Sequence, residues 1–126
     1  MNTAINPPGY PVHPFYSQAV EAREASRTLY VAGQVGVGPD GTIPGDVGGQ
    51  TSNALANLVN VLAAADMMPA DIVKFTIYLT EAANLDAFGT AAAPSLPQPP
   101  PAATLIVVKA LALPEMLVEI EAIAVR

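Results

Sequence analysis

Two glutamates, Glu119 and Glu121, stand two residues apart in the apolar run 116–125 near the end of the chain. Alternate residues of a strand point to the same face, so both carboxylates would point the same way, about 6–7 Å apart. The opposite face is apolar and consists of Val118, Ile120, Ala122 and Ala124. An unpaired buried carboxylate is costly. Two interpretations stay open: a solvated strand surface, or a glutamate that faces a pocket and orients water or moves protons there.

The chain lacks the residues for several other kinds of site. It has no Cys, which excludes disulfides and thiolate chemistry, and its single histidine cannot form a zinc site of the usual kind. That residue, His13, lies in the proline-rich stretch PPGYPVHP and is expected to be a solvated loop residue. We expect no metal and no cofactor. The net charge is −6 and the five basic residues form no run, so nucleic-acid binding is not expected.

The size and composition of the chain favour a single small domain. It has 126 residues, of which 52% are hydrophobic and only 13% charged. No apolar run approaches the roughly 18 residues that span a bilayer, and the start shows no signal peptide, so we expect a cytoplasmic protein without membrane association. Soluble monomers rarely expose large apolar patches, so the excess of apolar residues indicates a homo-oligomer.

Apolar periodicity predicts the elements of the first half. Residues 1–14 contain four prolines and are predicted to wrap over the surface. The β-like runs 15–20 and 27–35 flank a polar turn and predict a hairpin. A turn then leads to a predicted short strand at 42–45. From Asp46 to Ala65, helical spacing predicts a helix with one apolar stripe toward a sheet. That stripe consists of Val47, Thr51, Ala54, Leu55, Leu58, Val59 and Leu62.

A further strand follows the helix, and this strand–helix–strand order implies a right-handed crossover. Strict alternation predicts a strand over 72–79. Asn84 is predicted to cap a short helix over 85–93, which Gly89 weakens and a proline stops.

The last third contains two predicted strands after a rigid proline-rich connector at 94–101. Residues 102–108 are apolar on both faces apart from Thr104, which is typical of a strand buried on both sides. The run 116–125 is the second strand. Together the elements predict an α+β domain with two helices on one face of a mixed sheet. The other sheet face needs cover, which again supports an oligomer.

Several short motifs lie at a characteristic spacing. Pro101-Ala102-Ala103 opens a strand, Lys109 follows it, and Val118-Glu119-Ile120 closes the pattern. Nearer the start are Tyr-Ser-Gln-Ala-Val at 16–20 and Tyr-Val-Ala-Gly-Gln-Val-Gly-Val at 30–37. Over most of its length this pattern resembles the RidA (YjgF) family of imine and enamine deaminases. The resemblance implies a chorismate-mutase-like fold and a homotrimer whose sheets line a central barrel, with three sites in the clefts between subunits.

The resemblance also implies an activity and a set of site residues. Family members hydrolyse 2-imino acids, or their enamine tautomers, to 2-keto acids and ammonia. By matched position, Glu119 is the water-orienting carboxylate, and Tyr16 is the aromatic residue that closes the pocket, with simple core packing as the alternative. Gly33 and Leu105 match positions whose backbone lies along the pocket. Glu121 is interpreted as structural or exposed.

Three positions depart from the family pattern. Ala103 stands where the family has an arginine, Ala32 where it has a serine, and Gly89 where the deaminating members have an asparagine. An alanine cannot bind a carboxylate, and each lost charge-assisted bond removes about 1.5–3 kcal/mol. Arg23 or Arg27 could substitute, but nothing in the sequence places them there. The departures therefore indicate a retained fold, a more apolar pocket and a changed substrate.

Three functions follow, each with a small-molecule ligand as partner. The first is a hydrolase of the deaminase type that acts on an uncharged or differently charged imine or enamine through Glu119. The second is a non-catalytic trimer that binds or responds to a small molecule. The third is authentic 2-imino acid deamination with a relocated cation. Family members have sometimes been labelled ribonucleases, and the charge of this chain gives that label no support.

Overall fold

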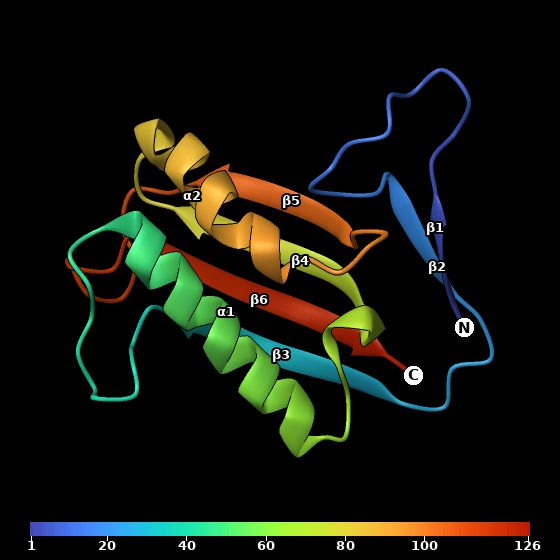
Figure 1. Ribbon diagram of the computed structural model, residues 1–126, viewed down its shortest axis with the longest axis horizontal. Coiled ribbons are helices and arrows are strands. Elements are labelled where there is room, and N and C mark those ends of the chain that lie inside the picture. Colours follow the sequence, from blue (N-terminus) through green and yellow to red (C-terminus); the bar gives the residue numbers. More distant parts are fainter.

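A four-stranded mixed sheet with two helices on one face forms the body of the protein in the computed structural model, which describes residues 1–126 (Figure 1). The strand order is β3 (Thr28–Val35), β6 (Val118–Val125), β4 (Ile72–Leu79) and β5 (Ala102–Val107). β6 runs antiparallel to both of its neighbours, and β4 pairs with β5 in parallel. The predicted α+β class, with both helices on one side of the sheet, is confirmed.

The two helices begin where the sequence indicated. α1 (Val47–Ala64) is capped by Asp46, whose carboxylate accepts a 2.8 Å hydrogen bond from the Gly49 N–H. α2 (Leu85–Ala92) begins after Asn84, although that side chain makes no capping bond. Short 3₁₀ turns occupy Pro69–Asp71, Ala82–Asn84 and Ala93–Ser95. Neither helix is long and apolar enough to cross a membrane.

The hydrophobic core lies between the helices and the sheet. Its most deeply buried side chains come from α1, β4 and β6, namely Leu58, Leu62, Leu79, Val118 and Ile120. Along β6 the burial alternates as predicted, with the apolar face under the helices and the two glutamates on the open face of the sheet. Successive side chains of a strand point to opposite faces whichever strands it pairs with, so this alternation can be predicted from the sequence.

The predicted apolar stripe of α1 left out a buried polar residue, Gln50, and included an exposed one, Val59. The Gln50 side chain is fully buried, whereas Val59 remains 39% exposed. The Gln50 amide nitrogen donates to the carbonyls of Pro44 (2.7 Å) and Glu115 (2.9 Å). Its oxygen accepts from the Leu117 N–H at 2.8 Å. A buried amide is tolerated when its bonds are made, and here they tie α1 to the segment that enters β6.

The N-terminal hairpin prediction is wrong. β2 (Ala19–Ala22) pairs antiparallel with β1 (Asn2–Ile5), and the two form a separate small sheet beside the body of the molecule (Figure 1). The preceding residue Ser17 instead bridges to Ala102 at the start of β5. Because β5 and β3 are opposite edges of the main sheet, this attachment keeps the segment away from β3.

Two further strand predictions need correction. Residues 42–45 form no strand, because the Asp40 carboxylate accepts bonds from the Thr42 N–H (3.0 Å) and hydroxyl (2.8 Å) and closes a turn. β5 is not buried on both faces within the single chain. It is an edge strand, and Ile106 and Val107 remain 44% and 49% exposed.

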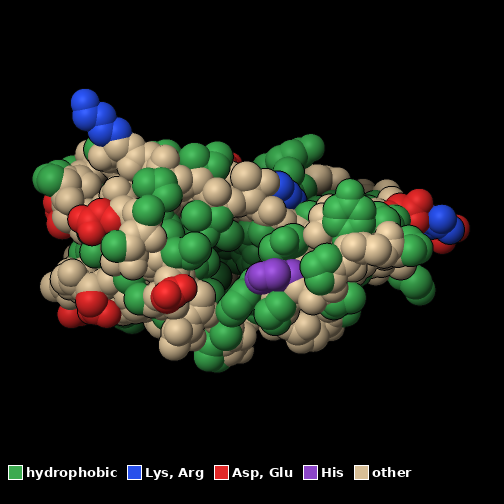
Figure 2. All heavy atoms as spheres, turned by 90° about the horizontal axis from the view of Figure 1, so that it is seen from above, with side chains coloured by type: hydrophobic (Ala, Val, Ile, Leu, Met, Phe, Trp, Pro, Cys, Tyr) green, Lys and Arg blue, Asp and Glu red, His purple; other side chains and the backbone are tan.

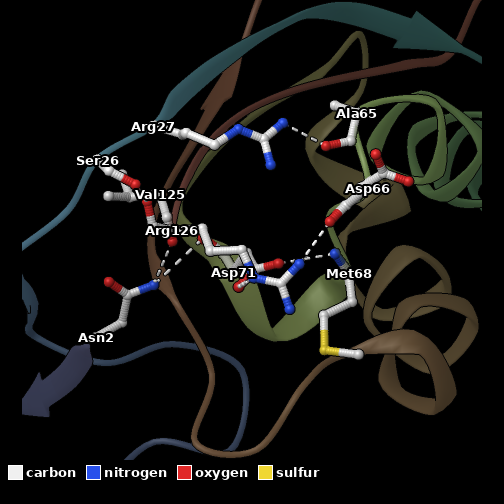
Figure 3. A network of polar contacts seen from close by, with 9 residues as sticks. All are labelled: Asn2, Ser26, Arg27, Ala65, Asp66, Met68, Asp71, Val125 and Arg126. Atoms are coloured by element: carbon white, nitrogen blue, oxygen red, sulfur yellow. Dashed lines mark hydrogen bonds and ion pairs between the residues drawn. The ribbon is translucent and has the colours of Figure 1, made fainter.

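Polar contacts join the two chain termini to each other, and the C-terminal Arg126 to the turn that follows α1 (Figure 3). The Arg126 guanidinium donates to the Asp66 carbonyl at 2.5 Å and lies 3.8 Å from the Asp71 carboxylate. The Asn2 amide donates to the Val125 carbonyl at 2.9 Å. Arg27 donates to the Ala65 carbonyl at 2.5 Å, so it satisfies a carbonyl group at the end of α1.

Candidate functional site

An apolar pocket of about 680 Å³ opens between α2, the β4–β5 edge of the sheet and the segment before β2. Thirteen of its 17 lining residues are hydrophobic. Figure 2 shows this hollow beside the single histidine, with hydrophobic side chains around it. The size suits a small organic molecule, because ligand pockets are concave, mostly apolar and of about 300–1,000 Å³.

Four of the residues predicted to bind substrate line this pocket: Tyr16, Gly89, Ala103 and Leu105. Ala103 and Leu105 lie on β5 opposite Phe75 and Ile77 of β4, and like them they pack toward the helices.

Gly89 lies on α2 and faces Phe15 across the pocket. A Cβ added at this glycine would meet the Phe15 ring at 3.7 Å, which is ordinary van der Waals contact. An alanine would therefore fit here without displacing the ring.

His13 lies in a loop, as expected from the sequence, but it also forms part of the pocket wall and is less solvated than predicted. It is half-buried, and its ring stacks on Tyr16 with centroids 4.4 Å apart and planes inclined by 22°. Its Nδ1 atom accepts a 3.1 Å hydrogen bond from the Phe15 N–H. The only sequence signal for this role is the pair of aromatic residues that follows within three positions, and the surrounding prolines obscured it.

Glu119 and Gly33 lie together, but on the other face of the sheet. β6 places Glu119 between Val35 of β3 and Tyr78 of β4. A bulge between Val31 and Gln34 carries Gly33. A Cβ at Gly33 would come within 2.7 Å of the Glu119 Cδ atom and closer still to its carboxylate oxygen, so the glycine leaves room for this side chain.

The predicted site is therefore divided within one chain. Ile120 lines the apolar pocket, and the neighbouring Glu119 points to the opposite face, as successive strand residues must. Glu119 and Gly33 do not meet Tyr16, Gly89, Ala103 and Leu105 in a single copy. A centre that used both groups would need two copies of the chain.

Tyr78 is a polar residue of the open face that the sequence reasoning missed. Its hydroxyl donates to the Glu121 carboxylate. This hydrogen bond is the main cause of a raised pKa at Tyr78, with smaller contributions from burial and from the charges of Glu121 and Glu119. Glu121, interpreted from sequence as structural or exposed, is thus the partner of Tyr78. Only the pairing of β4 with β6, which local patterns do not reveal, brings the two together.

No lysine or arginine lines the apolar pocket. Arg23 pairs with Glu21 at 2.9 Å, and Arg27 is bound at the end of α1. Neither arginine therefore compensates for Ala103 within the chain. The one carboxylate among the lining residues is Asp86, in the first turn of α2. No cluster of three or more His, Asp or Glu side chains is placed to hold a metal ion.

The fold and its lateral pocket define a small α+β protein of the Rid type. A solved structure of a Rid-family protein of unknown function from Yersinia pestis matches with a TM-score of 0.88 and 42% identity, covering 99% of this chain and 98% of that one. The RidA protein of an Antarctic Psychrobacter matches with a TM-score of 0.76 and 29% identity over 88% of each chain.

The chain belongs to the RidA (YjgF) family, whose family model, described as endoribonuclease L-PSP, matches residues 10–126. The mitochondrial protein mmf1 of Schizosaccharomyces pombe is 34% identical over 94% of this chain and 72% of its own. The 2-iminobutanoate/2-iminopropanoate deaminase of Mus musculus is 40% identical over 60% of this chain and 53% of its own.

Proposed function

We propose that this protein is a hydrolase of the deaminase type that acts on an imine or enamine without a carboxylate group. The observation that carries the proposal is the apolar pocket, in which Ala103 lies on the wall and no lysine or arginine is present. A carboxylate is held best by the paired donors of an arginine, and this wall offers none. The family, with relatives named as imino acid deaminases, supports the reaction type.

In this proposal the reactive centre lies between copies of the chain. One copy supplies the pocket wall, with Tyr16 closing it and Leu105 along its side, and the next supplies Glu119 with Gly33 beside it. The division of these residues between the two sheet faces favours this arrangement. A homotrimer would provide three such centres.

The proposed chemistry needs one activated water. Glu119 orients the water and accepts its proton as the oxygen attacks the imine carbon. The proton then passes to nitrogen, the C–N bond breaks, and ammonia leaves as the carbonyl forms. A closed apolar wall helps by holding the substrate in the attack geometry.

A non-catalytic ligand-binding protein is the second candidate. The observation that favours it is the position of Glu119, which a single chain directs away from the pocket. The two candidates differ in one variant. Glu119→Gln abolishes turnover if the carboxylate is the water-orienting group, and it leaves ligand binding intact in either case.

The test compares the wild type with Ala103→Arg and with Ala103→Gln, which is long but uncharged. The substrate is 2-iminopropanoate, generated in situ by an amino acid oxidase acting on alanine, with ammonia release as the readout. We expect background ammonia release from the wild type and from Ala103→Gln, and a rate about tenfold to a hundredfold above that background for the arginine variant alone. A wild type that is already active would show that a cation elsewhere binds the carboxylate and would refute the proposed substrate class.

A further inference from the structure

We propose that the apolar pocket selects cationic ligands, specifically protonated imines that carry an aromatic or apolar group and no carboxylate. The inference rests on the proposed function for the reaction, but its basis is a separate property of the pocket wall. That wall combines several aromatic rings with a single carboxylate and contains no lysine or arginine.

The aromatic rings come from three parts of the chain. Phe15 and Tyr16 belong to the segment before β2, Phe75 to β4 and Phe88 to α2. The face of an aromatic ring carries partial negative charge and attracts a cation within about 6 Å of its centre. Phe15 is the most exposed of the four, whereas Phe75 and Phe88 are largely buried in the core. Aromatic side chains that line one hollow can hold an organic ammonium ion over a ring face and an apolar substituent beside it.

The charge of the wall acts in the same direction. Asp86 is its only carboxylate, and it lies where α2 begins. Asp86 is an exposed residue, so its charge is screened and acts weakly, but it repels an anion and attracts an iminium group, and no arginine or lysine of the wall offsets it. The net charge of −6 adds a weak field of the same sign around the whole protein.

His13 does not reverse this balance. Its Nδ1 atom accepts the Phe15 N–H bond, so in the neutral ring the proton is on Nε2. With its ring stacked on Tyr16, the imidazole contributes another flat surface to the pocket.

The reaction that follows is balanced without any further reactant. A protonated aldimine, R–CH=NH₂⁺, and one water give the aldehyde R–CHO and NH₄⁺. The new carbon–oxygen bond forms from water, the C–N bond breaks, and both water protons end on the departing nitrogen. The protonated imine is also the more electrophilic form, so the form that the wall favours is the form that water attacks.

Binding of unreactive probes tests the selectivity directly. The probes are 2-phenylethylammonium, 2-phenylethanol and phenylacetate, which share one ring and differ in charge, and binding is measured by calorimetry. The variant is Asp86→Asn, and the matched control is Glu81→Gln, which removes the same charge from an exposed position outside the pocket.

We expect the cation to bind most tightly and the anion most weakly. Asp86→Asn should weaken binding of the cation by about twofold to fivefold, the upper range for an exposed ion pair, and leave binding of the alcohol unchanged. Glu81→Gln should change neither. Any of three results would overturn the inference: equal affinity for the cation and the anion, identical effects of the two variants on cation binding, or no binding of any probe.

Turnover separates this inference from the proposed function. The imine of phenylacetaldehyde is generated by an amine oxidase from 2-phenylethylamine, and 2-imino-3-phenylpropanoate by an amino acid oxidase from phenylalanine, so the two substrates differ by one carboxylate. We expect faster hydrolysis of the first. Cation-selective binding without any turnover would refute the proposed hydrolase function and would still support the inferred selectivity of the pocket. Turnover of both imines at equal rates would overturn the selectivity and the proposed substrate class, and it would support only the hydrolase reaction.

Discussion

Gly33→Ala tests whether the position of the Glu119 carboxylate matters. The new Cβ would lie 2.7 Å from the Glu119 Cδ atom and 2.9 Å from its Cγ atom, whereas ordinary contact begins at 3.4 Å. The carboxyl carbon must therefore move by about 0.7 Å, and its nearer oxygen by more. The glutamate is the far end of a flexible side chain on the open sheet face, so it can move without disturbing the core.

The expected effects on activity and stability are very different. Misplacing a reacting group by about 1 Å can cost 10²-fold in rate, so we expect kcat/KM to fall by about that factor. The free energy of unfolding should fall by no more than about 1 kcal/mol, at the lower end of overpacking costs. For a chain of this length that corresponds to a Tm decrease of about 4 °C.

The assay is hydrolysis of the imine made from 2-phenylethylamine, with calorimetric Tm measured on the same samples. Glu119→Gln and the double variant Gly33→Ala/Glu119→Gln complete a cycle. If the alanine acts only by displacing the carboxylate, the double variant is no slower than Glu119→Gln alone. Full activity in Gly33→Ala would refute the reasoning, because a catalytic Glu119 cannot keep its position there.

Three further predictions concern stability. Gly36→Ala should lower the free energy of unfolding by about 3 kcal/mol and the Tm by about 11 °C, because its Cβ would lie 2.5 Å from the Gln50 Cα atom in the α1 backbone. Gly89→Ala, with 3.7 Å available, is the control and should melt at or slightly above the Tm of the wild type, because alanine favours the helix more than glycine. Gln50→Ala should cost about 2–3 kcal/mol in urea unfolding, because it removes a fully buried side chain and leaves three partly buried backbone groups without that partner. A loss below 1 kcal/mol would contradict that. The bond to Glu121 raises the pKa of Tyr78 above 10.0 in the folded protein. The unfolded chain therefore loses the tyrosine proton at a lower pH than the folded protein does. The stabilisation from this hydrogen bond is complete below pH 10.0 and is lost as the pH rises through the folded-state pKa. Tyr78→Phe should remove that alkaline decline, and the tyrosinate difference titration between the two proteins should have its midpoint above pH 10.0; a midpoint at or below 10.0 would show that the hydrogen bond is absent in solution.

Sequence periodicity was sufficient wherever a feature depends on the local backbone. The strand over 72–79 and the alternating faces of β6 are as predicted, because alternation needs no knowledge of a partner strand. Asp46 begins α1 because its carboxylate caps an N–H three residues away. The missing arginine at Ala103 is likewise a property of the sequence alone.

Features that depend on which segments become neighbours in the fold could not be predicted from the sequence. β2 pairs with β1 and does not form the predicted hairpin, because Ser17 is held at the β5 edge of the sheet. Gln50, a polar residue on a helix, became core once three distant backbone groups were placed to bond with it.

The same distinction holds for the site. The family pattern named the residues, but only the strand pairing shows that Ala103 and Glu119 occupy opposite faces of one sheet. The sequence by itself therefore determined the fold class, the face to which each β6 residue points and the loss of the arginine. The tertiary structure decided which of these residues meet, because strand pairing joins positions far apart in the chain, and no local pattern encodes that choice.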